Sequence, residues 1–562
     1  MFFRKLKLLL IFTLLYQSPC NSKSNSLNEL NSRYLANYFS GIVAYENKNN
    51  TEALKFFKSS KILINKHDSY LKRYIYSLVL EGKVQQATNE LKQNFGKNNS
   101  DFFEAYLLIS LDYLKKGNFE KSNNYILKTQ KFINKDRISI AIHETLKQYF
   151  YVFENNKILK EKKILGNLSL ISEAFQRCYL GDQKTDIYFL QLINDQEADY
   201  SRYIYFYISY LINNKRLEEA KKITDELDYL NSTLLNAQGK KWIDQNKLNE
   251  FNKIFSCKNQ KDVVSEFLFL IANLYSSQND YEKSNFYLNI SHFLNPKFKF
   301  NLSLMAENYY LNKNYLKAKK IFNNFEEKNE LYYWYRIKKN AQIISMEKSK
   351  EEGLDYINSE FDKIKKPNIK MIFDIANFNR SVKKYKRAIT YYDELISIIN
   401  KENSEVYANI LYRRGGSHER LKNYQKSDED LFKAIEINPN DAYTLNYLAY
   451  SWLERDYKID EAIMFLEEAY SLESNDPYII DSIGWAYYLV DDFLKAENYL
   501  RRAVELMPND PIVNDHYGDI LWKLNRKIQA RYFWKNVMNL KETEDEMKKN
   551  IRDKLLKGLT NS

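Results

Sequence analysis

The side chains best suited to acid–base or metal chemistry are few and lie far apart along the chain. The five histidines are His67, His143, His292, His418 and His516. None of them forms a His-x-x-His or His-Glu-x-x-His pair, and no Cys-x-x-Cys occurs, so the ligand spacing of a zinc site is absent. The sequence therefore predicts no metal site and no cofactor.

Nucleophile and carboxylate patterns do not indicate catalysis either. Ser482 and Gly484 lie in DSIGW, which lacks the leading glycine of a nucleophile elbow and falls within a predicted helix. Adjacent carboxylates such as Asp491 and Asp492 fall in predicted turns, where solvated surface is the simpler interpretation. No glycine-rich phosphate loop is present. We expect no catalytic residues and no enzyme activity.

The remaining chemistry is that of binding. Aromatic rings beside hydrogen-bonding groups recur at positions that we expect to face one inner surface, and such rings are typical contact anchors. The predicted protein-binding residues are Tyr412, Tyr443, Asn446, Tyr450, Tyr478, Asp481, Trp485, Tyr488, Asp515, Asp519 and Trp522. The three aspartates would favour basic partner segments. The alternative is that some of these rings only fill gaps between neighbouring helices.

The elements that would position these residues are visible in PYIIDSIGWAYYLVDDFLKAENYLRRAVELMPND, residues 477–510. Apolar residues recur at spacings of three, four and seven, which predicts two helices joined by a turn at 490–492. Gly484 and Ala496 are small where two helices would approach closely. Pro508 cannot continue the second helix.

The same pattern of 34 residues recurs along the chain. The residues predicted to pack the repeats are Gly41, Ala53, Gly415, Ala434, Pro439, Gly484, Ala496, Ala503, Pro508, Gly518 and Ala530. The predicted organisation is a signal peptide at 1–22, repeats at 34–135, a divergent helical segment at 136–200, repeats at 201–402 and 408–544, and a capping helix or tail at 545–562. Residues 401–407 interrupt the period and are a candidate joint. The predicted fold is an all-α, right-handed solenoid, in which each pair buries its apolar face against its neighbours.

The start of the sequence predicts export. Arg4, Lys5 and Lys7 precede an apolar run from Leu8 to Tyr16 that is too short to span a bilayer, as in a signal peptide. No later stretch has about 18 uninterrupted apolar residues, so we expect no integral membrane segment after cleavage. Cys20 is a possible lipidation site, although YQSPC matches poorly the small residues expected before such a cysteine. We expect an exported, periplasmic protein and leave its association with the outer membrane open.

The other two cysteines, Cys178 and Cys257, lie 79 positions apart. In a linear array of repeats such residues rarely come within disulfide distance, so we expect two buried free thiols.

The distribution of charge along the chain is compatible with two functions. The whole chain carries +12, whereas residues 408–544 are net negative, so the rest is strongly basic. With an export signal, this charge points away from nucleic acid and toward envelope proteins or anionic envelope surfaces. One hypothesis is a scaffold that binds proteins or peptides in its concave groove. The alternative is a structural envelope protein whose basic N-terminal solenoid associates with cell wall or membrane.

The 34-residue units resemble the tetratricopeptide repeat, most specifically in 369–544. The stretch LNYLAYSWLERDYKIDEAIMFLEEAYSLESNDPYIIDSIGWAYYLVDDFLKAENYL is in addition similar to the C-terminal part of proteobacterial envelope tetratricopeptide proteins. Some of these are lipoproteins, and one type is an adaptor of a periplasmic C-terminal-processing protease. The resemblance implies an exported, non-catalytic scaffold that presents one protein to another. The poor lipidation motif departs from those relatives.

Overall fold

A computed structural model describes residues 32–559 except 65, 68, 97–99, 134–135, 196–198, 228–229, 231, 326–328, 400–403 and 542. The predicted signal peptide and Cys20 lie outside the described residues. Within them the regular elements are all helices, so the chain has the predicted all-α fold. Two compact units are formed: unit 1 from Met1–Asp225 and Thr233–Glu327, and unit 2 from Glu226–Ser232 and Lys328–Ser562.

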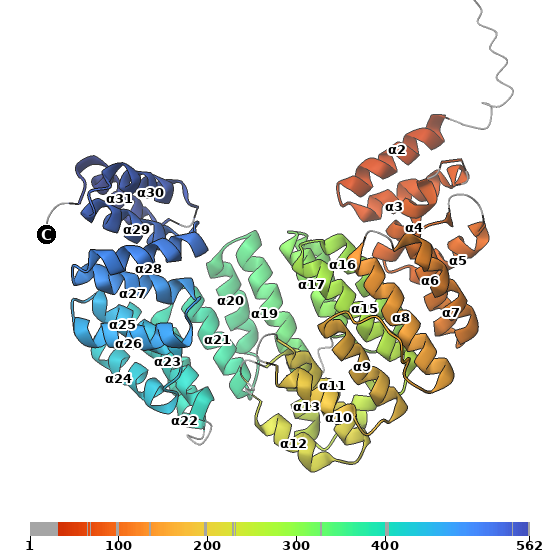
Figure 1. Cartoon of the computed structure of the whole chain (residues 1–562), viewed down its shortest axis with the longest axis horizontal. Coiled ribbons are helices and arrows are strands. Elements are labelled where there is room, and N and C mark those ends of the chain that lie inside the picture. The colour runs from red at the N-terminus through yellow and green to blue at the C-terminus, as the bar shows by residue number, and fades with distance from the viewer. Residues whose placement is uncertain are drawn as a thin grey trace, which may run out of the picture. The chain divides into compact units, whose positions relative to one another are not determined.

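Most helices follow one another as antiparallel pairs (Figure 1). Those of unit 1 are α2 (Ser32–Glu46), α3 (Asn50–Ser59), η1 (Lys61–Leu63), α4 (Tyr70–Leu80), α5 (Val84–Asn94), α6 (Phe103–Lys115), α7 (Phe119–Leu127), η3 (Lys128–Phe132), α8 (Arg137–Asn155), α9 (Asn167–Leu180), α10 (Thr185–Ile193), α11 (Ser201–Asn213), α12 (Leu217–Asp225), α13 (Leu234–Asp244), α14 (Asn249–Ile254), α15 (Gln260–Ser277), α16 (Tyr281–Leu294), α17 (Asn301–Leu311) and α18 (Tyr315–Phe322). Those of unit 2 are α19 (Glu330–Glu347), α20 (Lys350–Phe361), α21 (Ile369–Ser381), α22 (Tyr385–Ile398), α23 (Ser404–Arg420), α24 (Tyr424–Ile437), α25 (Ala442–Leu453), α26 (Ile459–Leu472), α27 (Pro477–Leu489), α28 (Phe493–Leu506), α29 (Pro511–Lys523), α30 (Lys527–Asn539) and α31 (Asp545–Lys557).

The turn inside most pairs has one recurring backbone conformation. The N–H of Asp492 donates to the carbonyl of Tyr487 at 3.0 Å, which satisfies a carbonyl at the end of α27. Asp491, the residue just before Asp492, takes a positive φ. Equivalent residues, with φ between 54° and 76°, include Lys48, Gly82, Gly117, Gly181, Lys215, Asn246, Asn279, Lys313, Lys383, Lys422, Asp456 and Asn525. This recurring turn sets the phase of the repeats, including the weakly patterned units at 201–231 and 232–264.

Close packing inside a pair depends on the small residues. A Cβ atom on Gly484 would lie 2.8 Å from Cγ of Leu500, and one on Gly518 would lie 2.5 Å from Cδ1 of Trp534. Gly41 and Gly415 face Phe57 and Leu431 in the same way. The alanines predicted to pack the repeats, Ala53, Ala434, Ala496, Ala503 and Ala530, are all buried. Pro439 and Pro508 are exposed just after the ends of α24 and α28.

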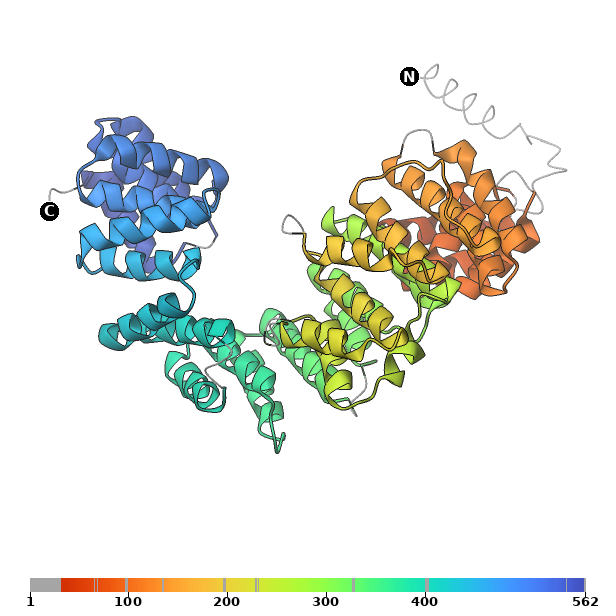
Figure 2. The ribbon, with the colours of Figure 1, turned by 60° about the horizontal axis from the view of Figure 1, so that its bottom comes forward.

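In unit 2 the pairs from α23 to α30 form successive layers, with α31 at the end (Figures 1 and 2). One core runs through these layers from Leu431 to Ile551. A second core joins Tyr392 of α22 to Val406 and Ile410 of α23. Packing is therefore continuous across the expected joint at 401–407, and the chain divides instead near residue 327.

In unit 1, helices that are far apart in sequence lie side by side. Helix α16 packs against α4 and α5, and the rings of Tyr76 and Phe286 stack with centroids 4.5 Å apart. Nζ of Lys48 lies 2.6 Å from Oε2 of Glu282. The later helices of the unit thus cover the early ones, which a simple linear array of pairs would not do.

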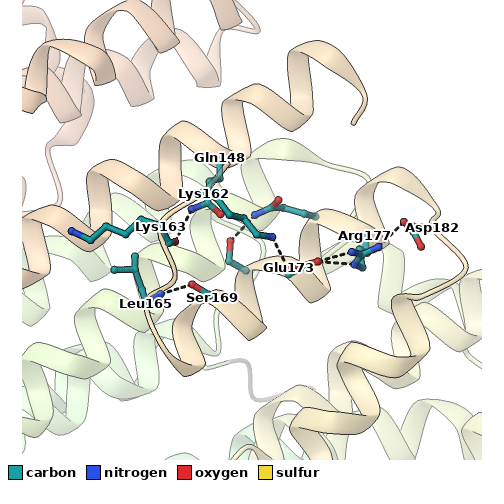
Figure 3. A network of polar contacts seen from close by, with 10 residues as sticks. Gln148, Lys162, Lys163, Leu165, Ser169, Glu173, Arg177 and Asp182 are labelled. Atoms are coloured by element: carbon teal, nitrogen blue, oxygen red, sulfur yellow. Dashed lines mark hydrogen bonds and ion pairs between the residues drawn. The ribbon is translucent and has the colours of Figure 1, made fainter. Parts of the chain in front are cut away.

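The divergent segment predicted at 136–200 contains α8, α9 and α10. Residues 156–166 connect α8 to α9, and an ion pair attaches them to helix α9 (Figure 3). Lys162 pairs with Glu173, which also pairs with Arg177, and Arg177 lies 2.8 Å from Asp182. The N–H of Leu165 donates to Oγ of Ser169 at 2.7 Å, at the start of α9. These contacts give this connection a defined course without the repeat pattern.

A disulfide joins Cys178 at the end of α9 to Cys257 before α15, with the two Cα atoms 5.9 Å apart. The prediction of two free thiols was wrong. It assumed that repeats meet only their neighbours in sequence, whereas α15 packs against α6, α8 and α9. Nζ of Lys258 donates to the carbonyl of Tyr179 at 2.8 Å beside the disulfide, which brings the two segments together.

Candidate functional site

The first helices of the unit 2 pairs form one layer. Helices α23, α25, α27 and α29 contact one another in this order, and α24, α26, α28 and α30 lie behind them. We call the side of this layer that bears the second residue of each repeat the inner face. All the residues that the sequence predicted for binding are on these four helices.

The three successive repeats 442–476, 477–510 and 511–544 expose a large apolar side chain at their second position, near the start of the first helix. Tyr443 is 52% exposed, Tyr478 57% and Ile512 48%. We call these three residues the exposed row. The carboxylates of Asp441, Asp476 and Asp510 accept backbone N–H groups at the starts of α25, α27 and α29, so they orient these helix ends. Burial and then Asp476 raise the pKa of the Tyr443 hydroxyl.

The other predicted rings are less exposed because they also pack between helices. Trp485 lies between Tyr488 and His516, with ring centroids 4.6 Å and 4.0 Å away and both rings nearly parallel to its own. Tyr412 meets Tyr447 edge to face at 5.6 Å. Burial raises the pKa of Tyr450, and Asn446, like Tyr450, is half-buried. These rings therefore contribute to packing as well as to the surface.

The predicted aspartates already have partners within the chain. Oδ2 of Asp481 lies 2.8 Å from Nδ1 of His516. Nζ of Lys554, on α31, donates to Asp515 and Asp519 at 2.7 Å each, and Nε1 of Trp534 donates to Asp519 at 2.9 Å. The expectation that these carboxylates attract a basic partner segment must be corrected, because the chain itself supplies the cation. Trp522 packs against Trp534, with centroids 5.3 Å apart.

Burial and the neighbouring charges shift the pKa values of His516 and Asp519. Burial alone would lower the pKa of His516, but Asp481 and then Asp515 and Asp519 raise it above its ordinary value. Burial and the adjacent Asp515 raise the pKa of Asp519, although Lys554 and His516 act in the opposite direction. Helix α31 therefore closes the end of unit 2 through an ionisable contact as well as through buried Ile551.

Unit 2 also contains a cationic cavity, lined mainly by residues of α21 to α23, which the sequence analysis did not identify. The cavity has a volume of about 520 Å³ and is lined by the cations Arg380, Lys383, Arg413 and Arg420 together with Asn377, Ser381, Tyr385 and Glu544. Nζ of Lys383 lies 2.9 Å from Oε1 of Glu544, so one carboxylate faces four cations.

Local contacts hold two of these arginines. Nε of Arg413 donates to Oδ1 of Asn409 at 2.7 Å, and its guanidinium lies over the ring of Phe373. Arg420 lies 3.4 Å from a carboxylate oxygen of Glu419. Arg380 is the twelfth residue of the repeat 369–402, the position that Tyr488 and Trp522 hold in later repeats, so this part of the cavity was open to prediction.

Two of the histidines have partners inside their own unit. His143 lies 2.8 Å from Thr129, and His516 lies 2.8 Å from Asp481. Within the residues that the structure describes, no group of three or more His, Cys, Asp or Glu side chains is arranged to hold a metal ion. Among those same residues, no helix combines the length and apolar character needed to cross a bilayer.

Comparison with known proteins agrees with the repeat geometry. A model described as the tetratricopeptide repeat matches residues 408–441, which comprise α23 and α24. A TPR repeat-containing protein of Pseudomonas aeruginosa is 34% identical over 111 residues, which are 20% of this chain and 19% of that protein. The chain thus spans about a fifth of that relative.

Solved tetratricopeptide proteins are also similar to parts of the chain. One from Parabacteroides merdae is 17% identical with a TM-score of 0.37, over 45% of this chain and 97% of that one. YrrB, described as a TPR protein with an unusual peptide-binding site, is 15% identical with a TM-score of 0.26, over 35% and 97%. The repeated helix pairs define a helical-repeat architecture for the described residues. Residues 408–441 match the tetratricopeptide repeat, and the other helix pairs among the described residues are arranged in a similar way.

Proposed function

We propose that this chain is an exported, non-catalytic scaffold that binds a protein segment on the inner face of unit 2. The observation that carries the proposal is the exposed row, Tyr443, Tyr478 and Ile512, which repeats at one position of three adjacent helices. Apolar and aromatic side chains held on rigid helices lose little conformational freedom on binding, so they are effective anchors.

The charge of unit 2 supports an acidic partner segment. The aspartates of the inner face pair with His516 and Lys554, so they contribute little net attraction. The cavity around Arg380, Arg413 and Arg420 carries an excess of positive charge. A segment that combines apolar residues with carboxylates would match the exposed row and this cavity, and its association would slow as salt is added.

The disulfide supports the proposed export. Disulfides form and persist in oxidising compartments and are rare where thiols are kept reduced. Cys178–Cys257 therefore fits the basic and apolar start of the sequence, which is typical of a signal peptide. A fusion of residues 1–30 to a reporter enzyme that is active only after export would test it. An inactive fusion would contradict the proposal.

The binding proposal is tested by two matched triple variants, each compared with the wild type after crosslinking in cells. The first replaces the exposed row with alanine. The control replaces Met464, Leu494 and Ile528, which are exposed on the second helices α26, α28 and α30. We expect loss of crosslinked partners from the first variant and retention in the control, with both folded by circular dichroism. Retention in the first variant would refute the assignment.

The surface-association alternative gives a different result. Association with anionic vesicles should then depend on the basic remainder of the chain and not on the exposed row. Sedimentation with such vesicles at low salt, equal for wild type and the first triple variant, would favour that alternative.

A further inference from the structure

The first helix of unit 1, α2, exposes positions that later repeats bury. In α27 and α29 the sixth position is held by Ser482, 4% exposed, and His516, 7% exposed. The tenth position of α29, Ile520, is 0% exposed. On this side of α29, His516 contacts Asp481 and Trp485 of α27, the first helix of the preceding pair. In the first repeat, which begins at Tyr34, the sixth and tenth positions are Phe39 and Val43 of α2, which are 58% and 60% exposed.

Helix α2 thus presents a stacking face that no described helix covers. At the other end of the array α31 covers the last pair and buries Ile551. Repeat proteins require a polar outer face or a cap on their terminal repeats, because an uncovered stacking face is apolar. Phe39 and Val43 are apolar, so the described part of this face lacks a polar surface and is suited to a contact with another apolar surface.

The pattern of α2 is complementary to itself. Leu35, Phe39 and Val43 recur at intervals of four, so they form one stripe along the helix, and Phe39 stands at the middle of Ser32–Glu46. The charged residues of α2 are Arg33 near its start and Glu46 at its end. Two copies of α2 in antiparallel orientation would place Leu35 against Val43, Phe39 against Phe39 and Arg33 near Glu46.

We propose that α2 is a self-association surface at which two copies of this chain pair about a two-fold axis close to Phe39. An interface of this kind is isologous, because the same patch serves both subunits. A helix of 15 residues is about 22 Å long, so the contact falls at the small end of specific interfaces. The dimer is therefore expected to dissociate on dilution. This proposal concerns unit 1 and does not depend on the binding surface of unit 2.

The test is sedimentation velocity of the full chain over a range of concentrations. Wild type should shift from monomer to dimer as concentration rises. Phe39→Glu should raise the dissociation constant by about tenfold or more, because two carboxylates would face each other near the axis. Leu494→Glu makes the same change at an exposed site of α28 and should dimerise like wild type. A monomer at every concentration, or equal dimerisation of Phe39→Glu, would overturn the proposal.

A cysteine experiment locates the axis. In a Cys20→Ser background the only other cysteines form the Cys178–Cys257 disulfide. Phe39→Cys should then yield disulfide-linked dimers on a non-reducing gel, whereas Tyr532→Cys, exposed on α30, should not. Since Phe39 is largely exposed, its replacement should leave the fold intact, which circular dichroism checks. Equal crosslinking at the two positions would contradict the proposed axis.

Discussion

Nζ of Lys554, on the last helix, lies 2.7 Å from Oδ2 of Asp519, on the first helix of the last complete pair. The same ammonium group reaches Asp515, and Asp519 also accepts the indole N–H of Trp534. Helix α31 therefore attaches to the array through a mostly buried cation as well as through apolar packing. A contact of this kind is costly to break, because the remaining carboxylates stay buried without a counter-charge.

Lys554→Met should lower the free energy of unfolding of unit 2 by about 2–3 kcal/mol, because Asp519 keeps its burial and loses its charged partner. Denaturant unfolding followed by tryptophan fluorescence measures it, since Trp522 and Trp534 are close to this contact. Lys557→Met, at an exposed position of the same helix, is the control. Equal stability of the two variants would mean that the pair contributes no net stabilisation.

The pH dependence of unit 2 should follow His516. Its pKa is higher in the folded protein than in the unfolded chain, so the folded state holds this proton more tightly. The resulting stability is fully present below the unfolded pKa, near 6.5, and is lost as pH rises through the folded pKa. The raised pKa of Asp519 acts in the same direction.

Unfolding free energies measured between about pH 6 and pH 9 should therefore fall with rising pH in wild type, and less steeply in His516→Gln. His418→Gln changes a histidine whose pKa burial lowers, so it should not flatten the slope. A slope that is unchanged in His516→Gln would show that His516 is not the responsible group.

Gly484→Leu tests the phase of the repeats. The new side chain would overlap Leu500, since even a Cβ atom would lie 2.8 Å from Cγ of Leu500. We expect a loss of about 1–3 kcal/mol from overpacking, seen as a lower melting temperature. Ser471→Leu, exposed on α26, should cause little change. An unaltered melting temperature in Gly484→Leu would contradict the described pair geometry.

Reduction of the disulfide should destabilise unit 1 and leave unit 2 unaffected. Removal of the Cys178–Cys257 crosslink frees a long loop in the unfolded chain, which costs about 2–4 kcal/mol of stability. Hydrogen exchange with and without reductant should show faster exchange in α9 and α15 and no change in α25 to α30. The double variant Cys178→Ser with Cys257→Ser should not respond to reductant. Equal exchange in α9 under both conditions would contradict this prediction.

Local pattern made much of unit 2 predictable. Pro439 and Pro508 mark the ends of α24 and α28, and the spacing of Gly484 and Ala496 depends on contacts between helices adjacent in sequence. Such contacts leave a repeated signature because every pair must solve the same packing problem. Arg380 occupies the twelfth position of its repeat, where Tyr488 and Trp522 were predicted to bind, so the repeat pattern could have identified it. Arg413 does not occupy a position at which the pattern predicted binding residues.

By itself, the amino-acid sequence determined the helix pairs, their period and the residues that close each turn, since these follow from spacing and backbone chemistry over a few tens of residues. Only the tertiary structure decided the contacts between distant segments. These are the Cys178–Cys257 disulfide, the packing of α16 on α4, and the pairing of Lys554 with Asp519. The physical reason is that such contacts depend on how the stacked pairs curve, and small changes in packing angle add up over many repeats without leaving a local pattern.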